Sequence, residues 1–434
     1  MTAIRLQDTR SGELRELVPR ADGHVGIYAC GPTVYSRIHV GNARPFVVFS
    51  LLKRFLEHEG LNVTLVINVT DVNDKIYDAA RPLGVSSVDL AEEMTAHYRA
   101  DTDALGLGRP DAEPLASETI EPIVALISDL IDAGHAYAVD GDVYFRVRSD
   151  PDYGSLSRRA IDEMNQGEGE RLSPVGESLK EDPLDFALWK AHKEGEDSVW
   201  YAPWGRGRPG WHIECSAMSE ALLGETIDIH GGGHDLVFPH HENERAQSTC
   251  AHGGKVFARY WLHNGFVTVN HEKMAKSVGN VLLLRELLKD LPGEAIRMAL
   301  LSGHYRQPLD WNDEVAADAR RKLDRLYGAL RALQAVEPAA GVTAPAAFMA
   351  ALEDDLNTPM ALAVLFELAH GANTATDDAE RARIKAELID AGALLGLLQQ
   401  APESWFEWSP AGTGLDPAEI DRQLALRAAA RAAK

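Results

Sequence analysis

The chain has few cysteines and no long apolar run. Its 434 residues include three cysteines, Cys30, Cys215 and Cys250, an odd number too small for a disulfide scaffold. This usage indicates a reducing, cytoplasmic compartment. No stretch approaches the roughly 18 apolar residues that a membrane-spanning helix needs, and residues 1–18 are charged throughout and lack the apolar core of a signal peptide. We therefore expect neither export nor membrane insertion.

Positive charge is also scarce. The chain has 43 Lys and Arg residues against 66 Asp and Glu residues, which gives a formal net charge of −23. Such a surface repels polyanions on average. Because charges are screened over about 8 Å at physiological salt, a local basic face is still compatible with this balance. We therefore expect no nucleic-acid binding by the surface as a whole.

The apolar pattern predicts an α/β part followed by an all-α part. Residues 25–68 read as a strand, a Gly-containing turn, a helix and a second strand, which is typical of a parallel sheet. Apolar runs recur at 226–230 and 258–269, so we expect the sheet to be assembled from separated parts of the chain. From about residue 294 onward, helical periodicity predicts a helical bundle. The length predicts about three domains.

One predicted helix of the bundle, 315–334, is rich in basic residues. It carries Arg320, Arg321, Lys322, Arg325 and Arg331 against Asp318 and Asp324. Two interpretations stand: a face that binds nucleic acid, or a solvated helix face with intrahelical ion pairs.

Two segments have the chemistry of a phosphate site. The first is the strand–turn–helix unit at 28–44, where His39 and Asn42 precede or open a helix whose N–H groups and dipole suit a phosphate. The second is a loop in which Lys273 and Lys276 could neutralise a polyphosphate as charge develops. The simpler alternatives are a capped helix and an exposed lysine pair.

A third set of residues has the chemistry of a zinc site. Cys30 and Cys215 can supply thiolates, and His240 and Glu244 are four residues apart on one face of a predicted helix start. His241 with Glu244, at a spacing of three, is an open alternative to His240. Two buried thiols beside an acidic helix start would produce the same pattern without a metal. Cys250 has no partner nearby and reads as a small core residue.

Taken together, these segments closely resemble the cysteinyl-tRNA synthetase family of class I aminoacyl-tRNA synthetases. The matching strings occur in family order up to about residue 395. They are IYACGPTVY, HVGNARPFVVF, INVTDVNDKI, EDPLDFALWK, WGRGRPGWHIECSAMS, DIHGGGHDLVFPHHENERAQS, HNGFVTVNHEKMAKSVGN and LNTPMALAVLFEL.

The resemblance implies a Rossmann-type, parallel-sheet catalytic domain with an inserted subdomain, followed by an all-α helical-bundle domain. The implied division is a first catalytic half (1–110), an inserted connective subdomain (111–200), a second catalytic half with the zinc site (201–270), a signature loop and stem-contact region (271–313), and a helical anticodon-binding domain that is shortened at its C-terminus (314–434).

The resemblance also implies roles for individual residues. The first signature, which binds ATP and acts in catalysis, falls on His39, Gly41 and Asn42, and the second falls on Lys273 and Lys276. The family's zinc ligands fall on Cys30, Cys215, His240 and Glu244. The amino-acid pocket falls on Cys30, Thr70, Trp211 and His230.

The implied activity is ATP-dependent ligation of L-cysteine to tRNA(Cys) through cysteinyl-adenylate. One Zn²⁺ per chain would select the substrate thiolate, and Mg²⁺ would accompany ATP. The enzyme would act in the cytoplasm as a monomer, without a membrane. The alternative is a cysteine ligase of the mycothiol pathway, which resembles the same core and zinc site but passes the activated cysteine to an amino sugar.

The chain departs from the family pattern at four places. Ala275 stands where the signature loop usually has Ser, while Asn73 and Ser50 each stand where Asp is usual. The family usually continues beyond the segment that matches EIDRQLALRAAARAAK, so anticodon reading is expected to rely less on a C-terminal tail.

Overall fold

A four-stranded parallel sheet forms the centre of the computed structural model, which describes residues 3–21, 23–161, 164, 179–274, 279–410, 422–423 and 425–427. The strand order is β11-β10-β3-β4, and all three pairings are parallel. The strands are β3 (His24–Ala29), β4 (Asn62–Ile67), β10 (Ile227–Gly233) and β11 (Ala258–Asn264). Nearly every residue of these strands is buried, as expected for a parallel sheet covered on both faces. The predicted Rossmann-type architecture is confirmed.

Helix α1 (Val40–His58) connects β3 to β4 and is the central helix of the catalytic part. Its N-terminus is closed by a capping box between His39 and Asn42, which satisfies backbone N–H groups that a helix start leaves unpaired. Arg44 is fully buried on this helix and donates to the backbone carbonyls of Gly265, Phe266 and His304. Helix α1 is therefore attached to the segment that follows β11.

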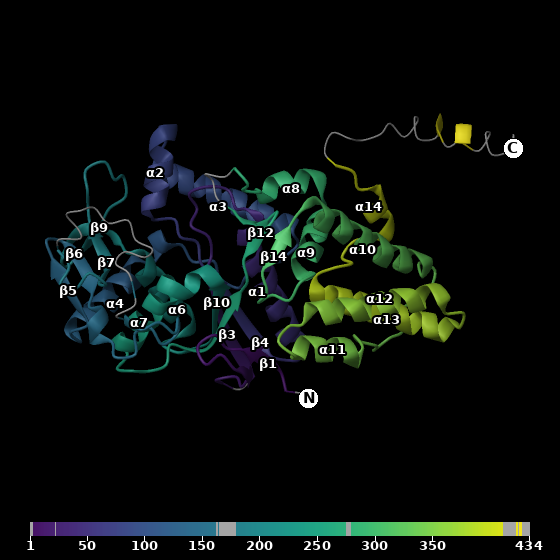
Figure 1. Cartoon of the computed structure of the whole chain (residues 1–434), viewed down its shortest axis with the longest axis horizontal. Helices are drawn as coiled ribbons and strands as arrows, with labels where there is room; N and C mark the ends of the chain where they lie inside the picture. Colours follow the sequence, from purple (N-terminus) through teal and green to yellow (C-terminus); the bar gives the residue numbers. More distant parts are fainter. Residues whose placement is uncertain are drawn as a thin grey trace.

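An inserted subdomain lies between β4 and β10, at the left of Figure 1. It holds an antiparallel sheet in the order β5-β6-β7-β9-β8. Its hairpin turns at Asp140 and Gly141, both with positive φ, and Asp-Gly is a dipeptide that favours such a turn. The α-helices and strands described between β4 and β10 are α2 (Asp74–Leu83), α3 (Ser87–Ala104), α4 (Ile120–Asp132), β5 (Ala136–Val139), β6 (Asp142–Phe145), β7 (Phe186–Ala191), β8 (Trp200–Ala202), β9 (Gly205–Pro209) and α6 (Trp211–Leu223). Of these, α3 packs into the core of the parallel sheet.

Short elements join the sheet to the C-terminal part. After β10 comes an irregular turn (Val237–His241) and α7 (Glu242–Ala251). A small sheet in the order β13-β12-β14 follows, formed by β12 (Val267–Val269), β13 (Glu272–Lys273) and β14 (Leu309–Trp311), with α8 (Leu284–Asp290) and α9 (Gly293–Leu301) beside it. The N-terminal strands β1 (Arg5–Gln7) and β2 (Leu14–Glu16) pair with each other.

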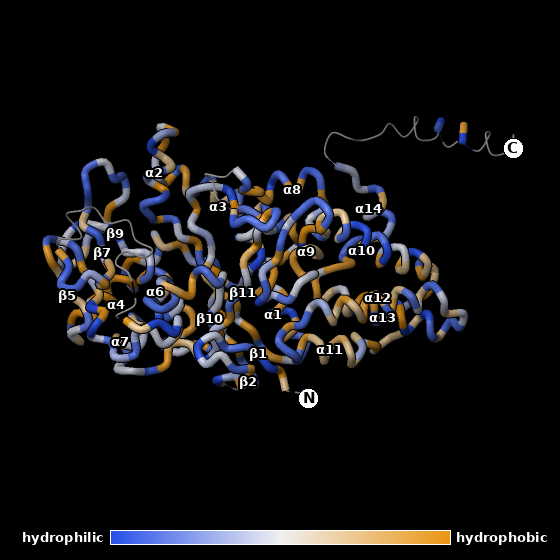
Figure 2. The backbone as a smooth tube through the Cα atoms, in the orientation of Figure 1, coloured by the Kyte–Doolittle hydropathy of each residue, from blue (hydrophilic) through white to orange (hydrophobic). Residues whose placement is uncertain are grey.

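The C-terminal part is a helical bundle, at the right of Figure 1. Its helices are α10 (Asp313–Ala332), α11 (Ala346–Glu353), α12 (Thr358–Thr374), α13 (Asp378–Leu395) and α14 (Pro402–Glu407). Figure 2 shows apolar and polar segments alternating along these helices. Buried residues of α1, such as Leu52, belong to the same apolar cluster as Leu326 and Leu388 of the bundle, so the two parts share a core. In the described part of the chain, no helix is long and apolar enough to cross a bilayer.

Candidate active site and metal centre

Cys30, Cys215, His240 and Glu244 meet at the carboxyl end of the central sheet. Cys30 follows β3, Cys215 lies on α6, His240 lies in the irregular turn, and Glu244 lies in the first turn of α7. In an open parallel sheet this edge is where ligand sites usually lie. Residues more than 200 positions apart are thereby brought into one buried cluster.

The four ligand atoms fit a single metal ion. Cys30 Sγ lies 3.9 Å from Cys215 Sγ, 3.6 Å from His240 Nε2 and 3.4 Å from Glu244 Oε1, and His240 Nε2 lies 2.9 Å from Glu244 Oε1. Bonds of 2.0–2.3 Å around a tetrahedral zinc place ligand atoms roughly 3.3–3.8 Å apart. Two thiolates, one imidazole and one carboxylate are also a donor set that zinc accepts.

A second set overlaps with the first: Cys30, His230, His241 and Glu244 also bring ligand atoms within 4.8 Å of one another. This set has one thiol, and its histidines have other partners. His230 Nε2 lies 2.8 Å from Glu244 Oε2, and His241 Nδ1 lies 2.7 Å from His263 Nε2. His240 instead turns Nε2 toward the thiols while its Nδ1 contacts His212 Nδ1 at 2.8 Å. His240 Nε2 lies beside both Cys30 Sγ and Glu244 Oε1, in the set that has two thiols, so the geometry favours His240.

Proton affinities in the cluster are set by burial and by mutual contacts. Burial, with the contact to Cys215, raises the pKa of Cys30 well above its ordinary value. At Cys215, contacts with Cys30 and His240 outweigh the effect of burial and lower the pKa to about 6. Burial opposes protonation of His240, but Glu244 and Cys215 outweigh it and raise the pKa to about 10. These directions favour the thiolate form of Cys215, which is the form that binds a metal ion.

Of the predicted pocket residues, Trp211 contacts His240 and His230 contacts Glu244 of this cluster. The Trp211 ring stacks on His240 with centroids 4.2 Å apart, and Lys75 Nζ lies 5.6 Å from the Trp211 ring. Thr70 is buried and accepts a hydrogen bond from Asn68 Nδ2 at 3.2 Å. His230 stacks on Trp261, with centroids 4.7 Å apart.

Sequence reasoning missed other buried groups in the cluster. His212 and His263 complete a set of five buried histidines with His230, His240 and His241. Burial lowers the pKa of His212 and of His263 well below the ordinary value, which keeps both rings neutral. The histidines were visible in the strings HIECS, PHHENE and HNG, but nothing in the spacing indicated that these strings meet in space.

Of the predicted phosphate-site residues, His39, Gly41 and Asn42 lie at the N-terminus of α1. Asn42 N donates to His39 Nδ1 at 3.2 Å, and His39 N donates to Asn42 Oδ1 at 3.1 Å. A Cβ on Gly41 would lie 2.6 Å from Met274 Cε, so the segment after β13 packs directly on this helix start. Lys273 is exposed, with Nζ 5.6 Å from the Phe266 ring. Lys276 and Ala275 lie outside the described residues.

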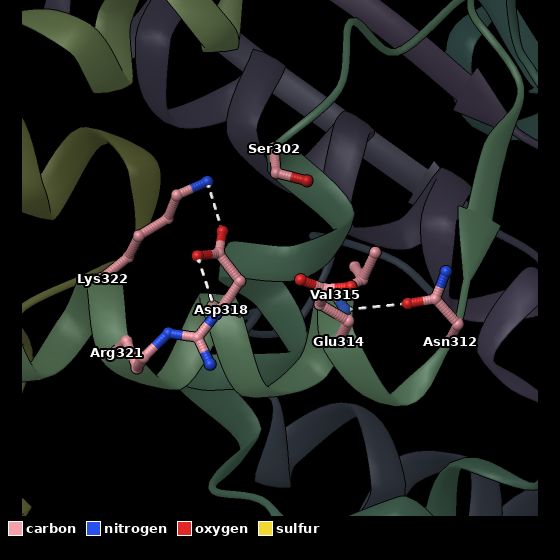
Figure 3. A pocket seen from close by; sticks show the side chains of 8 residues that line it. Ser302, Asn312, Glu314, Val315, Asp318, Arg321 and Lys322 are labelled. Atoms are coloured by element: carbon pink, nitrogen blue, oxygen red, sulfur yellow. Dashed lines mark hydrogen bonds and ion pairs between the residues drawn. The ribbon is translucent and has the colours of Figure 1, made fainter.

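The basic residues of α10 have partners within the bundle. Arg321 and Lys322 both pair with Asp318 beside a cavity of about 290 Å³ (Figure 3). Arg320 lies over the Trp405 ring at 4.2 Å, and Arg331 over the Phe406 ring at 4.1 Å. This arrangement matches the interpretation of α10 as a helix face with intrahelical ion pairs.

Comparisons with known proteins agree with one another. Residues 16–321 match the family described as tRNA synthetases class I (C) catalytic domain, and residues 347–399 match the DALR domain. The chain is 55% identical over 428 residues to the cysteine–tRNA ligase of Parvibaculum lavamentivorans, covering 98% of this chain and 90% of that protein. It is 50% identical over 439 residues to the cysteine–tRNA ligase of Maricaulis maris, covering 100% and 93%. The fold resembles that of Mycobacterium tuberculosis methionyl-tRNA synthetase in complex with methionyl-adenylate, with a TM-score of 0.59, 15% identity, and coverage of 90% of this chain and 92% of that one.

Proposed function

Because the chain belongs to the cysteine–tRNA ligase family of class I aminoacyl-tRNA synthetases, we propose that it charges tRNA(Cys) with L-cysteine through cysteinyl-adenylate, with Zn²⁺ selecting the substrate thiolate. The chain is an enzyme that charges tRNA with cysteine. The observation that carries the finer proposal is the buried convergence of Cys30, Cys215, His240 and Glu244.

In the first step, a carboxylate oxygen of cysteine attacks the α-phosphorus of ATP. The bond from that phosphorus to the bridging oxygen breaks, and pyrophosphate leaves with its Mg²⁺. In the second step, a hydroxyl of the terminal adenosine of tRNA attacks the carbonyl carbon, and AMP leaves. Neither step needs a covalent enzyme intermediate, so the protein contributes positioning and charge stabilisation.

The start of α1 is the proposed phosphate end of the site. Its first turn contains no acidic residue, so the positive end of the helix dipole is not compensated there. His39 Nδ1 serves the helix cap, and Nε2 is then the ring nitrogen that would donate to a phosphate oxygen. Gly41 and Asn42 let the backbone approach ATP, and Lys273 and Lys276 would supply the second set of positive charges.

Cys30, Cys215, His240 and Glu244 would hold the zinc ion, and Thr70, Trp211 and His230 would enclose the cysteine side chain. When bound, zinc supplies a Lewis acid that takes a soft thiolate in strong preference to the hydroxyl of serine. To prefer cysteine over serine by a factor of 10⁴ to 10⁵, the enzyme needs a free-energy difference of roughly 5.5 to 7 kcal/mol between the two substrates. A small difference in side-chain shape supplies only about 1–3 kcal/mol. A direct bond between zinc and the sulfur of cysteine would supply the remaining free energy. No separate site for hydrolysing mischarged tRNA is then needed.

The alternative acceptor is an amino sugar, as in the mycothiol-pathway ligases. The helical C-terminal part, with its match to the DALR domain at 347–399, favours tRNA. We place the reaction in the cytoplasm, with the enzyme acting as a monomer.

The test offers both acceptors to the purified protein. Radiolabelled cysteine and ATP are added with tRNA(Cys) in one reaction and with glucosaminyl-inositol in another. We expect acid-precipitable label with the tRNA alone. Label on the amino sugar, without charging of the tRNA, would overturn the proposal.

A further inference from the structure

Arg44 is a fully buried arginine in the first turns of α1, close to Asn42 of the first signature. Its Nη1 donates to the backbone carbonyls of Gly265 at 2.8 Å and Phe266 at 3.1 Å. Its Nη2 donates to the carbonyl of His304 at 3.1 Å. One guanidinium group therefore holds two separate segments of the chain against the helix whose start is the proposed phosphate site.

The surroundings of Arg44 make it an unusual residue for this place. Burial lowers its pKa to about 10, and no charged neighbour in the described part of the chain opposes that effect. Arg44 Nε has no hydrogen-bond partner among the described residues. Burying a charge without a paired carboxylate carries a large desolvation penalty, which an apolar side chain of similar size would avoid. Packing alone therefore does not explain an arginine here.

The first segment that Arg44 holds leads directly to Lys273 of the second signature. Gly265 and Phe266 precede β12, and β12 pairs antiparallel with β13, where Lys273 lies opposite Thr268. Lys273 Nζ also lies 5.6 Å from the Phe266 ring. The position of Lys273 relative to α1 thus depends on where residues 265–266 are held.

The second segment that Arg44 holds supports the first. Gly265 N donates to the carbonyl of Tyr305 at 2.8 Å. A Cβ on Gly265 would lie 2.5 Å from the carbonyl group of Gln307, so the two backbones are in close contact. Because the same guanidinium binds the carbonyl of His304, both segments are held together against α1.

The chain that follows β13 returns to the start of the same helix. Val40 N donates to the carbonyl of Leu282 at 2.9 Å, and Leu284 N donates to the carbonyl of Ile38 at 3.0 Å. The second signature is therefore attached to α1 on both sides in sequence. Backbone hydrogen bonds make the attachment after it, and the side chain of Arg44 makes the attachment before it.

We infer that Arg44 is a positioning residue for adenylate formation, which sets the distance between the phosphate-binding start of α1 and Lys273 on β13. Arginine suits this role because its planar group directs fixed donors at two segments at once, whereas lysine has one ammonium on a flexible chain. The inference rests on the proposed function. A displacement of about 1 Å between groups that act together in catalysis can lower a rate by about 10²-fold.

The experiment measures the rate constant of cysteinyl-adenylate formation in a single turnover, with the enzyme in saturating excess over ATP. This rate constant does not depend on the fraction of chains that are folded. Arg44→Met should lower it by about 10²-fold, while zinc content and the Kd for cysteine stay unchanged. Arg44→Lys keeps the positive charge and should show a smaller loss, and it serves as the test if Arg44→Met does not fold.

Arg297→Met is the matched control. Arg297 is only 1% exposed and also donates to backbone carbonyls, those of Leu105 and Gly396. These bonds lead to the ends of α3 and α13 and not to the second signature. Arg297→Met should therefore lower the midpoint of thermal unfolding, as Arg44→Met does, but keep the single-turnover rate constant of the wild type.

A double-mutant cycle with Lys273→Ala tests the path from Arg44 to Lys273. If Arg44 acts by placing Lys273, Arg44→Met should cost much less in the Lys273→Ala background than in the wild type. An undiminished loss in that background, an equal loss in Arg297→Met, or wild-type rate constants in the Arg44 variants would overturn this inference alone. A wild-type enzyme that forms no adenylate would contradict the proposed function, and the inference with it.

Discussion

Glu244 Oε2 lies 2.8 Å from His230 Nε2, and both side chains are fully buried. The other carboxylate oxygen, Oε1, lies 2.9 Å from His240 Nε2 and 3.4 Å from Cys30 Sγ. One carboxylate therefore connects a histidine of β10 to the proposed zinc ligands. This connection fixes the orientation of Glu244, and it joins His230, a proposed pocket residue, to the proposed metal centre.

The first prediction concerns zinc content. Cys215→Ser removes one of two thiolates, so we expect the purified protein to lose most of its zinc, which should be about one equivalent per chain in the wild type. Metal analysis by plasma mass spectrometry measures this directly. Cys250→Ser is the control, because this thiol is also buried but lies outside the cluster, and it should keep its zinc. Full zinc in Cys215→Ser would contradict the ligand assignment.

The second prediction distinguishes the two overlapping ligand sets. His240→Asn should abolish zinc binding, whereas His241→Asn should retain it, because it is His240 Nε2 that lies beside Cys30 Sγ and Glu244 Oε1. The two substitutions are chemically identical, adjacent in sequence and equally buried. Retention of zinc after dialysis against a chelator is the measurement. The reverse pattern would assign the metal to the set with His230 and His241.

The third prediction concerns the signature loop. Lys276→Ala should lower the rate of cysteine-dependent ATP–pyrophosphate exchange by about 10²-fold or more, while zinc content and cysteine binding stay unchanged. Lys289→Ala is the control, since this lysine is paired with Glu286 on the surface of α8. A rise in the KM for ATP with an unchanged kcat would instead indicate ground-state binding by Lys276.

The strand–helix–strand unit at 25–68 and the hairpin at Asp140 and Gly141 were predictable, because each depends on local pattern and local turn chemistry. The cluster of five histidines was not, because His212 meets His240, and His241 meets His263, only after separate strands and helices pack. The same holds for Arg44 and His304, which are far apart in the sequence. Side-chain contacts of this kind depend on topology, which periodicity does not specify.

The fourth prediction concerns the attachment of α2 beside Trp211. Asp74 pairs with Lys190 at 2.9 Å and with the buried Arg208. Burial alone would raise the pKa of Asp74, but the two cations outweigh it and lower the pKa below 3.8. A lowered pKa means that the stabilisation is present above pH 3.8 and is lost as the pH falls through the lower, folded-state value.

We therefore expect Asp74→Asn to reduce the free energy of unfolding at neutral pH by about 1 kcal/mol, a modest value because the Asp74 side chain is 43% exposed. The difference from wild type should disappear in acid. Urea unfolding over a series of pH values measures it, with Asp78→Asn as control on the same helix, where the pair with Arg81 is exposed. A difference that persists unchanged in acid would show that the ion pair is not its cause.

The most direct test of the account is the ratio of kcat/KM for cysteine to that for serine in ATP–pyrophosphate exchange by the zinc-loaded enzyme. Selection through a bond from the metal to the substrate sulfur predicts a ratio of about 10⁴ or more. A ratio of about 10 to 200, which a pocket achieves by shape alone, would contradict the role proposed for Cys30, Cys215, His240 and Glu244.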